Sequence, residues 1–170
     1  MELNRNTATQ TKVYPTRILQ FGEGNFLRAF TDWIVNKMNK DIDFNTGIDV
    51  VQPLPNGMAG MLNDQDGLYH VYLKGIKNSQ PVKEYSLIDC LNVGINPYTE
   101  FEKYEQSYLN PDLRFVFSNT TEAGITMDET DSLDMQPQNS FPAKVAALLY
   151  NRFKKFDGAS DKGLIFFAVD

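Results

Sequence analysis

Residues 17–29 read Arg17-Ile18-Leu19-Gln20-Phe21-Gly22-Glu23-Gly24-Asn25-Phe26-Leu27-Arg28-Ala29, and they are the most informative part of the chain for its fold class. Its first five residues predict a β-strand, and the residues after the second glycine predict the start of a helix. Gly22 lets the chain turn sharply between them, and Gly24 lets the backbone approach an anion with no Cβ in the way. Because the amides and the positive end of the helix would face that anion, the stretch predicts a site for the pyrophosphate of a dinucleotide.

The glycine pattern on its own is incomplete. A full fingerprint reads G-x-G-x-x-G, and Leu27 stands at the third glycine position. A glycine turn that binds no ligand therefore remains an alternative. The sequence after the turn favours the functional interpretation, because apolar side chains recur at helical spacing over 25–38 and would press one face of a helix onto a sheet. These side chains are Phe26, Phe30, Trp33, Ile34 and Met38.

The rest of the chain alternates predicted strands and helices. Strands are expected at 48–51, 113–117 and 164–169, helices at 97–108 and from Pro142 (capped by Ser140) to about 156, and a β-hairpin at 69–73 and 82–88. The last helix is expected to bury Val145, Leu148, Leu149, Arg152 and Phe153. A long loop is expected over 53–67, a loosely held arm over 1–15, and a single domain over 16–170. Together these elements predict an α/β, Rossmann-like, doubly wound and mainly parallel sheet with an inserted β-hairpin.

Ligands of such sheets bind outside the carboxyl ends of the strands. Three segments would meet there: the turn at 22–28, the loop after Val51, and 118–122. Thr120 and Thr121 either contact the ribose beside a nicotinamide or cap the following turn. Glu122 either relays a proton at the same edge or is a first-turn acid that favours the local dipole.

Composition narrows the class of protein. The 170 residues carry a formal charge of −6, which argues against a nucleic-acid partner, and the basic cluster Arg152, Lys154 and Lys155 is expected on a solvated helix face. No apolar run reaches the length of a membrane span, and no signal segment opens the chain. The single cysteine, Cys90, fits a reducing compartment, so we expect a cytoplasmic protein with no membrane contact. The only histidine, His70, cannot build a metal set with Cys90 alone, so we expect a metal-free site.

Four blocks of sequence together resemble the N-terminal domain of the mannitol dehydrogenase family of long-chain polyol dehydrogenases. They are residues 18–30 around the glycine turn, 65–69 (Gln-Asp-Gly-Leu-Tyr), 114–125 and 141–144 (Phe-Pro-Ala-Lys). The resemblance implies NAD as cofactor, bound through residues 18–29 with Thr120 and Thr121. It also implies reversible hydride transfer to a hexuronate, reducing tagaturonate to altronate. In that family Phe26 and Arg28 replace the third glycine; Phe26 would pack the helix on the sheet, and Arg28 would lie near a phosphate or along the helix surface.

The resemblance also carries departures and rival interpretations. The acid expected at the end of the second strand, to hold a ribose hydroxyl, is replaced by Gln52; its amide could still bind a hydroxyl, so NAD is expected and NADP stays open. The family's catalytic groups lie in a C-terminal helical domain, so we expect no catalytic residue here, and cofactor binding with little or no turnover. Alternatives are a stand-alone, non-catalytic dinucleotide-binding or interaction module, and the cofactor domain of a fructuronate or mannitol reductase. An exposed interface for the second domain would favour self-association.

Overall fold

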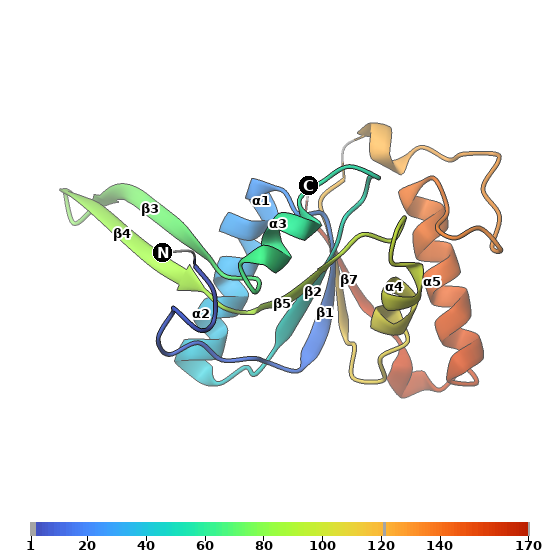
Figure 1. Ribbon diagram of the computed structural model, residues 1–170, viewed down its shortest axis with the longest axis horizontal. Helices are drawn as coiled ribbons and strands as arrows, with labels where there is room; N and C mark the ends of the chain where they lie inside the picture. Colours follow the sequence, from blue (N-terminus) through green and yellow to red (C-terminus); the bar gives the residue numbers. More distant parts are fainter. Residues whose placement is uncertain (1–2, 121, 170) are drawn as a thin grey trace.

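The computed structural model describes residues 3–120 and 122–169, which fold around a five-stranded parallel sheet (Figure 1). Its strands are β1 (Thr16–Phe21), β2 (Gly47–Val51), β5 (Leu91–Ile95), β6 (Phe115–Ser118) and β7 (Ile165–Ala168), in the order β5-β2-β1-β6-β7. The chain runs outward from β1 to β2 and β5, then returns past β1 to β6 and β7. This reversal is the doubly wound topology, and it confirms the predicted fold class.

Helices cover both faces of this sheet (Figure 1). α1 (Asn25–Ala29), α2 (Thr31–Ile42) and α3 (Ala59–Asp64) lie on one face, and α4 (Phe101–Tyr108) and α5 (Phe141–Lys155) on the other, with short 3-10 turns η1 (Glu122–Ile125) and η2 (Ser160–Lys162). Each face has its own apolar core. Val35 and Leu62 belong to the first core, and Tyr104 and Leu148 belong to the second.

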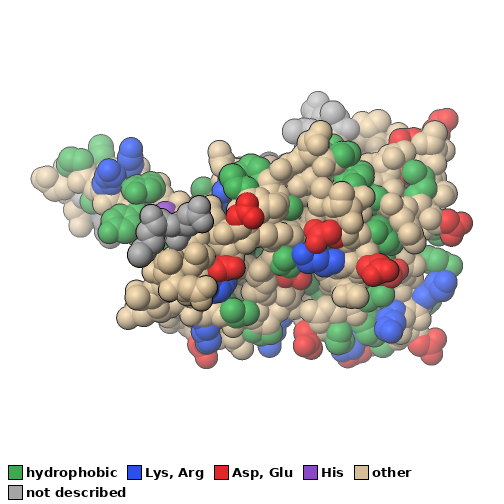
Figure 2. All heavy atoms as spheres, viewed as in Figure 1, with side chains coloured by type: hydrophobic (Ala, Val, Ile, Leu, Met, Phe, Trp, Pro, Cys, Tyr) green, Lys and Arg blue, Asp and Glu red, His purple; other side chains and the backbone are tan. Residues whose placement is uncertain are grey.

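The inserted hairpin is confirmed. β3 (Tyr69–Lys77) and β4 (Gln80–Ile88) pair antiparallel as a separate two-stranded sheet that projects from the body of the molecule (Figure 2). Asn78 and Ser79 both have positive φ, at 52° and 60°, which matches the right-handed twist of the strands that they connect.

The helix predicted over 25–38 is wrong in its continuity. It is interrupted at Phe30, where φ is −114° and ψ is −75°, and α2 begins at the next residue. The hydroxyl of Thr31 donates to the carbonyl oxygen of Leu27 at 2.9 Å. A hydroxyl bonded back to the preceding turn bends helices, so Thr31 accounts for a break that apolar spacing does not reveal.

The predicted packing face of this helix is wrong in part: Trp33 packs against the first core, but three other residues of that face do not. Phe26 and Phe30 are 51% and 48% exposed, so Phe26 does not pack the helix on the sheet, and Ile34 is exposed as well. The buried side consists instead of Leu27, Thr31, Asp32, Val35, Asn36 and Asn39. Polar residues can face the sheet because each finds a partner; the Asn39 side chain, for example, bonds both the N–H and the carbonyl of Thr46.

One α-helix and one strand were not predicted. The expected loop over 53–67 contains α3, and β5 follows the hairpin. Asn92 and Gly94 give β5 a poor strand signature, yet both are needed. The Asn92 amide donates to Tyr14 O and Thr16 Oγ1, and a Cβ on Gly94 would lie 2.7 Å from the carbonyl oxygen of Ala59 in α3.

α5 confirms its predicted start and, at Leu148 and Arg152, part of its predicted buried face. The Ser140 hydroxyl caps the helix by accepting from the Ala143 N–H. Leu149 and Phe153 are 42% and 67% exposed, whereas Arg152 is buried at 3%. The guanidinium of Arg152 donates to main-chain carbonyls of Tyr108, Asn110 and Lys162, so it does not belong to a solvated basic face.

The N-terminal arm is irregular but firmly attached. The backbone N–H of Arg5 donates to Asp66, and its guanidinium donates to carbonyls of Asp89 and Leu91. Tyr14 is 5% exposed within the first core. The expectation of a loosely held arm is therefore wrong for the described part of the arm.

Within residues 3–120 and 122–169, no helix combines the length and apolar character that a membrane crossing requires.

Candidate functional site

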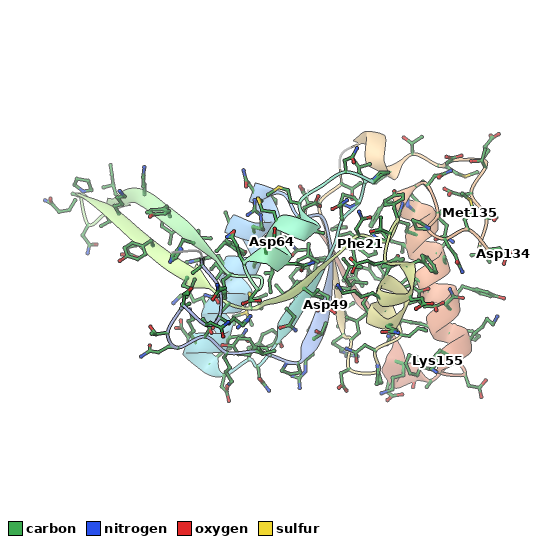
Figure 3. The ribbon with its side chains drawn as sticks, viewed as in Figure 1. Phe21, Asp49, Asp64, Asp134, Met135 and Lys155 are labelled. Carbon is green, nitrogen blue, oxygen red and sulfur yellow. The ribbon has the colours of Figure 1, made fainter. Side chains whose placement is uncertain are left out.

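The three segments predicted to meet do so at the carboxyl edge of the sheet. β1 lies between β2 and β6, in parallel register with both. The Gly22 N–H donates to the carbonyl oxygen of Val51 at 3.0 Å, which ties the glycine turn to the end of β2. Phe21, the last residue of β1, sits near the centre of the molecule between the two helical layers (Figure 3).

Gly22 is required by the backbone itself. Its φ is +119°, a conformation that side chains of L-residues rarely adopt, and an added Cβ would lie 3.1 Å from Leu27 Cδ1. Gly22 therefore produces the sharp turn from β1 into α1, as predicted.

Gly24 is not required by the fold. It is the N-cap of α1, with φ −68° and ψ 165°, and a Cβ built on it would have no atom within 4 Å. The first-turn amides of a helix have no intrahelical partner, and here no side chain caps them either. The space that a Cβ would fill is therefore open beside bare amides, which is the arrangement that an anion needs.

Arg28 supports the turn from inside. Its Nε donates to the carbonyl oxygen of Glu23 at 2.9 Å, its Nη2 donates to Asn25 Oδ1 at 2.6 Å, and its guanidinium lies over the Tyr69 ring. The side chain does not extend along the helix surface. It places a positive charge beside residues 22–25 while holding their backbone, which favours the prediction of a charge near a phosphate.

Two hollows flank the turn along the strand ends. A cleft of about 460 Å³ on the β6 side is lined by Phe21, Pro53, Leu54, Asn119, Thr120, Gly124, Thr126, Asn139, Ser140 and Phe141. A polar hollow of about 360 Å³ on the β2–β5 side is lined by Gln52, Pro55, Asn56, Gly57, Ala59, Gly60, Asn63, Asn96, Thr99 and Glu100. An extended ligand that crosses the glycine turn would reach one hollow at each end.

Gln52 does not have a free amide, contrary to expectation. It is 2% exposed; its Nε2 donates to Leu54 O and Pro55 O, and its Oε1 accepts from the Ala59 N–H. Every strong contact of this amide goes to its own loop and to α3. Gln52 therefore shapes the hollow and offers no group to a ribose hydroxyl.

The remaining predicted residues take different places. Ile18, Leu19 and Gln20 are buried in β1 at 0–1% exposure, so they support the turn from beneath. Glu23 is 8% exposed and accepts from the Met58 N–H, which fastens the loop after β2 to the turn. Thr120 lines the cleft beside β6. Thr121 lies outside the described residues, as does the side chain of Glu122.

Sequence reasoning missed Lys144, whose side chain is buried behind the cleft. Lys144 is 2% exposed, and its Nζ donates to the carbonyl oxygen of Asn139 at 2.9 Å and to the Tyr98 hydroxyl at 3.2 Å. Tyr98 donates in turn to Pro53 O, so three strand-end loops are joined. Burial lowers the pKa of Lys144. The available signal was its spacing of four residues from Leu148, on the buried side of α5.

This arrangement suits binding more than chemistry. It offers bare amides, a nearby guanidinium and a partly apolar cleft, which together can hold an anionic, extended ligand. Within residues 3–120 and 122–169, no three histidine, cysteine or acidic side chains gather as a metal set would require.

The chain is similar to known oxidoreductases. Residues 16–170 match the family model described as the mannitol dehydrogenase Rossmann domain. Altronate oxidoreductase of Bacteroides thetaiotaomicron is 50% identical over 168 residues, which cover 99% of this chain and 35% of that protein. Altronate oxidoreductase of Bacillus subtilis is 44% identical over 164 residues, covering 96% of this chain and 34% of that protein.

A solved structure shares the fold. The Pseudomonas fluorescens mannitol 2-dehydrogenase ternary complex with NAD and D-mannitol superposes with a TM-score of 0.72 at 19% identity, covering 91% of this chain and 36% of that chain. The chain thus spans about a third of the length of the curated relatives that it matches.

Proposed function

The chain belongs to the mannitol dehydrogenase family, and on that premise we propose that it binds NAD(H) across the carboxyl edge of its sheet, with the pyrophosphate on residues 22–26. One observation carries the proposal: Gly24 is a glycine that the fold does not need, at the uncapped start of α1, where a Cβ would have no atom within 4 Å and where Arg28 holds the neighbouring carbonyl of Glu23. At the start of a helix, such a glycine leaves room for a ligand to approach the backbone closely.

The two hollows indicate which half of the cofactor lies on each side of the glycine turn. The adenosine half would lie on the β2–β5 side, near Asn96 and Glu100, and the nicotinamide half in the cleft beside Phe21 and Thr120. When bound, the nicotinamide would supply a hydride. The chain's own residues bind the diphosphate, orient the two halves and enclose one ring. Gln52 is committed to its loop, and the carboxylate of Glu100 lines the adenosine hollow, where it accepts from Lys103 Nζ at 3.1 Å and from the Asn96 N–H at 3.4 Å. An acid at this place favours NAD over the additional phosphate of NADP.

The substrate of the whole enzyme is a further part of the proposal. Altronate oxidoreductases resemble this chain at 44–50% identity, which supports reduction of tagaturonate to altronate in hexuronate catabolism. Those relatives are about three times as long, and we place the substrate-binding and proton-transfer groups in the part that this chain does not span. The 170 residues alone would bind NADH and transfer little hydride, because positioning of the second reactant contributes several kcal/mol to lowering the barrier.

Two measurements test the function. Calorimetric titration with NADH and with NADPH should show binding that favours NADH; absence of NADH binding at millimolar concentration would refute the cofactor role. NADH oxidation with tagaturonate should show no turnover above background. Robust turnover by these 170 residues would refute the proposal that the substrate-binding and proton-transfer groups lie in the part that this chain does not span.

A separate observation favours self-association of this chain. An open groove of about 500 Å³ on the α2 side of the sheet is lined almost wholly by apolar side chains, among them Phe30, Phe117 and Phe167. Phe167 is 48% exposed on β7. Sedimentation velocity should show dimers or larger species that a Phe167→Asp variant loses; a monomer at all concentrations would refute this proposal.

A further inference from the structure

A buried polar cluster lies beneath the glycine turn, apart from the groups that would touch a dinucleotide. Asp32 of α2 is 0% exposed, and its Oδ2 lies 3.0 Å from the hydroxyl of Tyr69, the first residue of β3. The same hydroxyl lies 2.9 Å from the carbonyl oxygen of Arg28 in α1. One phenol therefore joins α1, α2 and the hairpin.

The hydrogen bonds of the Tyr69 hydroxyl indicate the protonation state of Asp32. A phenol has one proton to donate, and here it faces two acceptors, Asp32 Oδ2 and Arg28 O. If Asp32 is ionised, the carboxylate competes for that proton, and the Tyr69 hydroxyl can donate to only one of the two oxygens. If Asp32 is neutral, its O–H donates to the Tyr69 oxygen, and Tyr69 donates to Arg28. Only the neutral acid satisfies both contacts.

The surroundings of Asp32 favour that neutral form. Burial raises the pKa of Asp32 to about 7, against the opposing effects of its hydrogen bonds and of the Arg28 charge. The polar, titratable and charged groups that face it are Gln20 from β1, Thr31 from α2, Arg28 from α1, Tyr69 from β3, and the Cys90 thiol with neighbouring Asp89 from the segment before β5. Burial also raises the pKa of the Cys90 thiol, so the thiol stays neutral at ordinary pH.

The cluster reaches the turn at two points. The amide of Gln20, 3.5 Å from Asp32 Oδ2, donates to the carbonyl oxygen of Gly22 at 3.1 Å. Arg28, whose carbonyl accepts from Tyr69, donates through its guanidinium to the carbonyl oxygen of Glu23. The backbone conformation at residues 22–25 is therefore linked to the hydrogen bonds that Asp32 makes.

We propose that neutral Asp32 is a positioning residue for the dinucleotide turn, acting through Tyr69 and Arg28, and that loss of its proton weakens cofactor binding. The ligand in this statement rests on the proposed NAD(H) function. When Asp32 ionises, Tyr69 donates to the carboxylate and releases the carbonyl of Arg28. The end of α1 then loses its tie to the hairpin, and the amides that face the pyrophosphate lose their fixed geometry.

The experiment is calorimetric titration of the full chain with NADH at about pH 5.5 and about pH 8.5. The wild type should bind about tenfold more weakly at the higher pH. Asp32→Asn should keep the low-pH affinity at both values, because the Asn amide donates to Tyr69 as the neutral acid does. Tyr69→Phe should be weak at both values. A wild-type pH dependence retained in Asp32→Asn would overturn the proposal.

Two control variants separate Asp32 from other ionisable side chains. Asp49 is a partly buried acid whose pKa burial raises to about 6, but it lies within β2 and accepts from Thr16, away from the turn (Figure 3). His70 is exposed and follows Tyr69 in the hairpin. Asp49→Asn and His70→Gln should both keep the wild-type pH dependence, and its loss in either would contradict the assignment to Asp32.

A ligand-free readout distinguishes failure of this proposal from failure of the NAD function. Amide NMR signals of Gly22, Gly24 and Asn25 should shift with pH in the wild type and stay constant in Asp32→Asn. Infrared difference spectra near pH 6 should show a protonated carboxyl band that Asp32→Asn lacks. If NADH fails to bind but the NMR and infrared signals appear, the cofactor role is refuted and the positioning role of Asp32 is supported. If the NMR and infrared signals are absent, the positioning role of Asp32 is refuted.

Discussion

Replacing Gly24 by valine separates the requirements of the fold from those of the ligand. At φ −68° and ψ 165°, an L-residue is unstrained, and the new Cβ would have no atom within 4 Å. Gly24 is the N-cap of α1, where glycine is preferred over valine, so the substitution should lower the free energy of unfolding by about 1 kcal/mol at most, offset in part by the loss of glycine flexibility in the unfolded chain. The ligand-free protein should therefore stay folded, with a small change in Tm.

The effect on cofactor binding should be much larger. A valine side chain at the N-cap fills the space that the pyrophosphate needs to reach the first-turn amides. Hydrogen bonds to a charged acceptor contribute about 1.5–3 kcal/mol each, so losing two of them costs about 3 kcal/mol or more. This corresponds to at least a hundredfold, roughly, in the Kd for NADH.

Calorimetry with NADH, alongside thermal melts, measures both quantities. Gly75→Val is the matched control, because Gly75 lies in the hairpin and also has no atom within 4 Å of an added Cβ. It should keep both Tm and affinity. Wild-type affinity in Gly24→Val, with an intact fold, would refute the placement of the pyrophosphate on this turn.

Three further predictions concern stability. In the folded protein the pKa of Asp32 is about 7, whereas an aspartate in the unfolded chain has a pKa of roughly 4. Between these values only the folded state keeps the proton. The contribution of neutral Asp32 to the free energy of unfolding is therefore full below about pH 4 and is lost as the pH rises to about 7. Urea titrations should show wild type losing up to about 4 kcal/mol over that interval relative to Asp32→Asn; equal slopes would contradict the assignment. Arg152→Met should cost about 2–4 kcal/mol, because the guanidinium serves several buried carbonyls, whereas Lys154→Met should stay within about 0.5 kcal/mol; matching losses would contradict its buried role. Ser140→Ala should lower the unfolding free energy by about 1 kcal/mol through loss of the α5 cap, and an unchanged Tm would show that the cap contributes little.

Features governed by neighbouring residues could be predicted from the sequence. The strand–glycine–helix order fixed the turn at Gly22, and the Ser140–Pro142 pair located the start of α5. The alternating hairpin was found because its strands and its turn follow local rules. The parallel, doubly wound class of the sheet followed from the alternation of strands and helices.

Features that depend on distant partners could not be predicted. Helical spacing placed Arg152 on the buried side while its charge placed it in a solvated basic cluster, and the sequence could not decide between them because its carbonyl partners lie on α4 and in the loop beyond it. β5 was missed because Gly94 serves close packing against α3 rather than strand propensity. The helix face was misplaced because Asp32 and Asn39 are buried beside partners that only the fold brings near.

The most direct test of the central claim is a crystal structure of this chain with NADH. The pyrophosphate oxygens should lie about 3 Å from backbone nitrogens of residues 24–26, with the nicotinamide beside Thr120. A diphosphate bound elsewhere, such as in the apolar groove near Phe167 or beside Arg152, would contradict the proposed site.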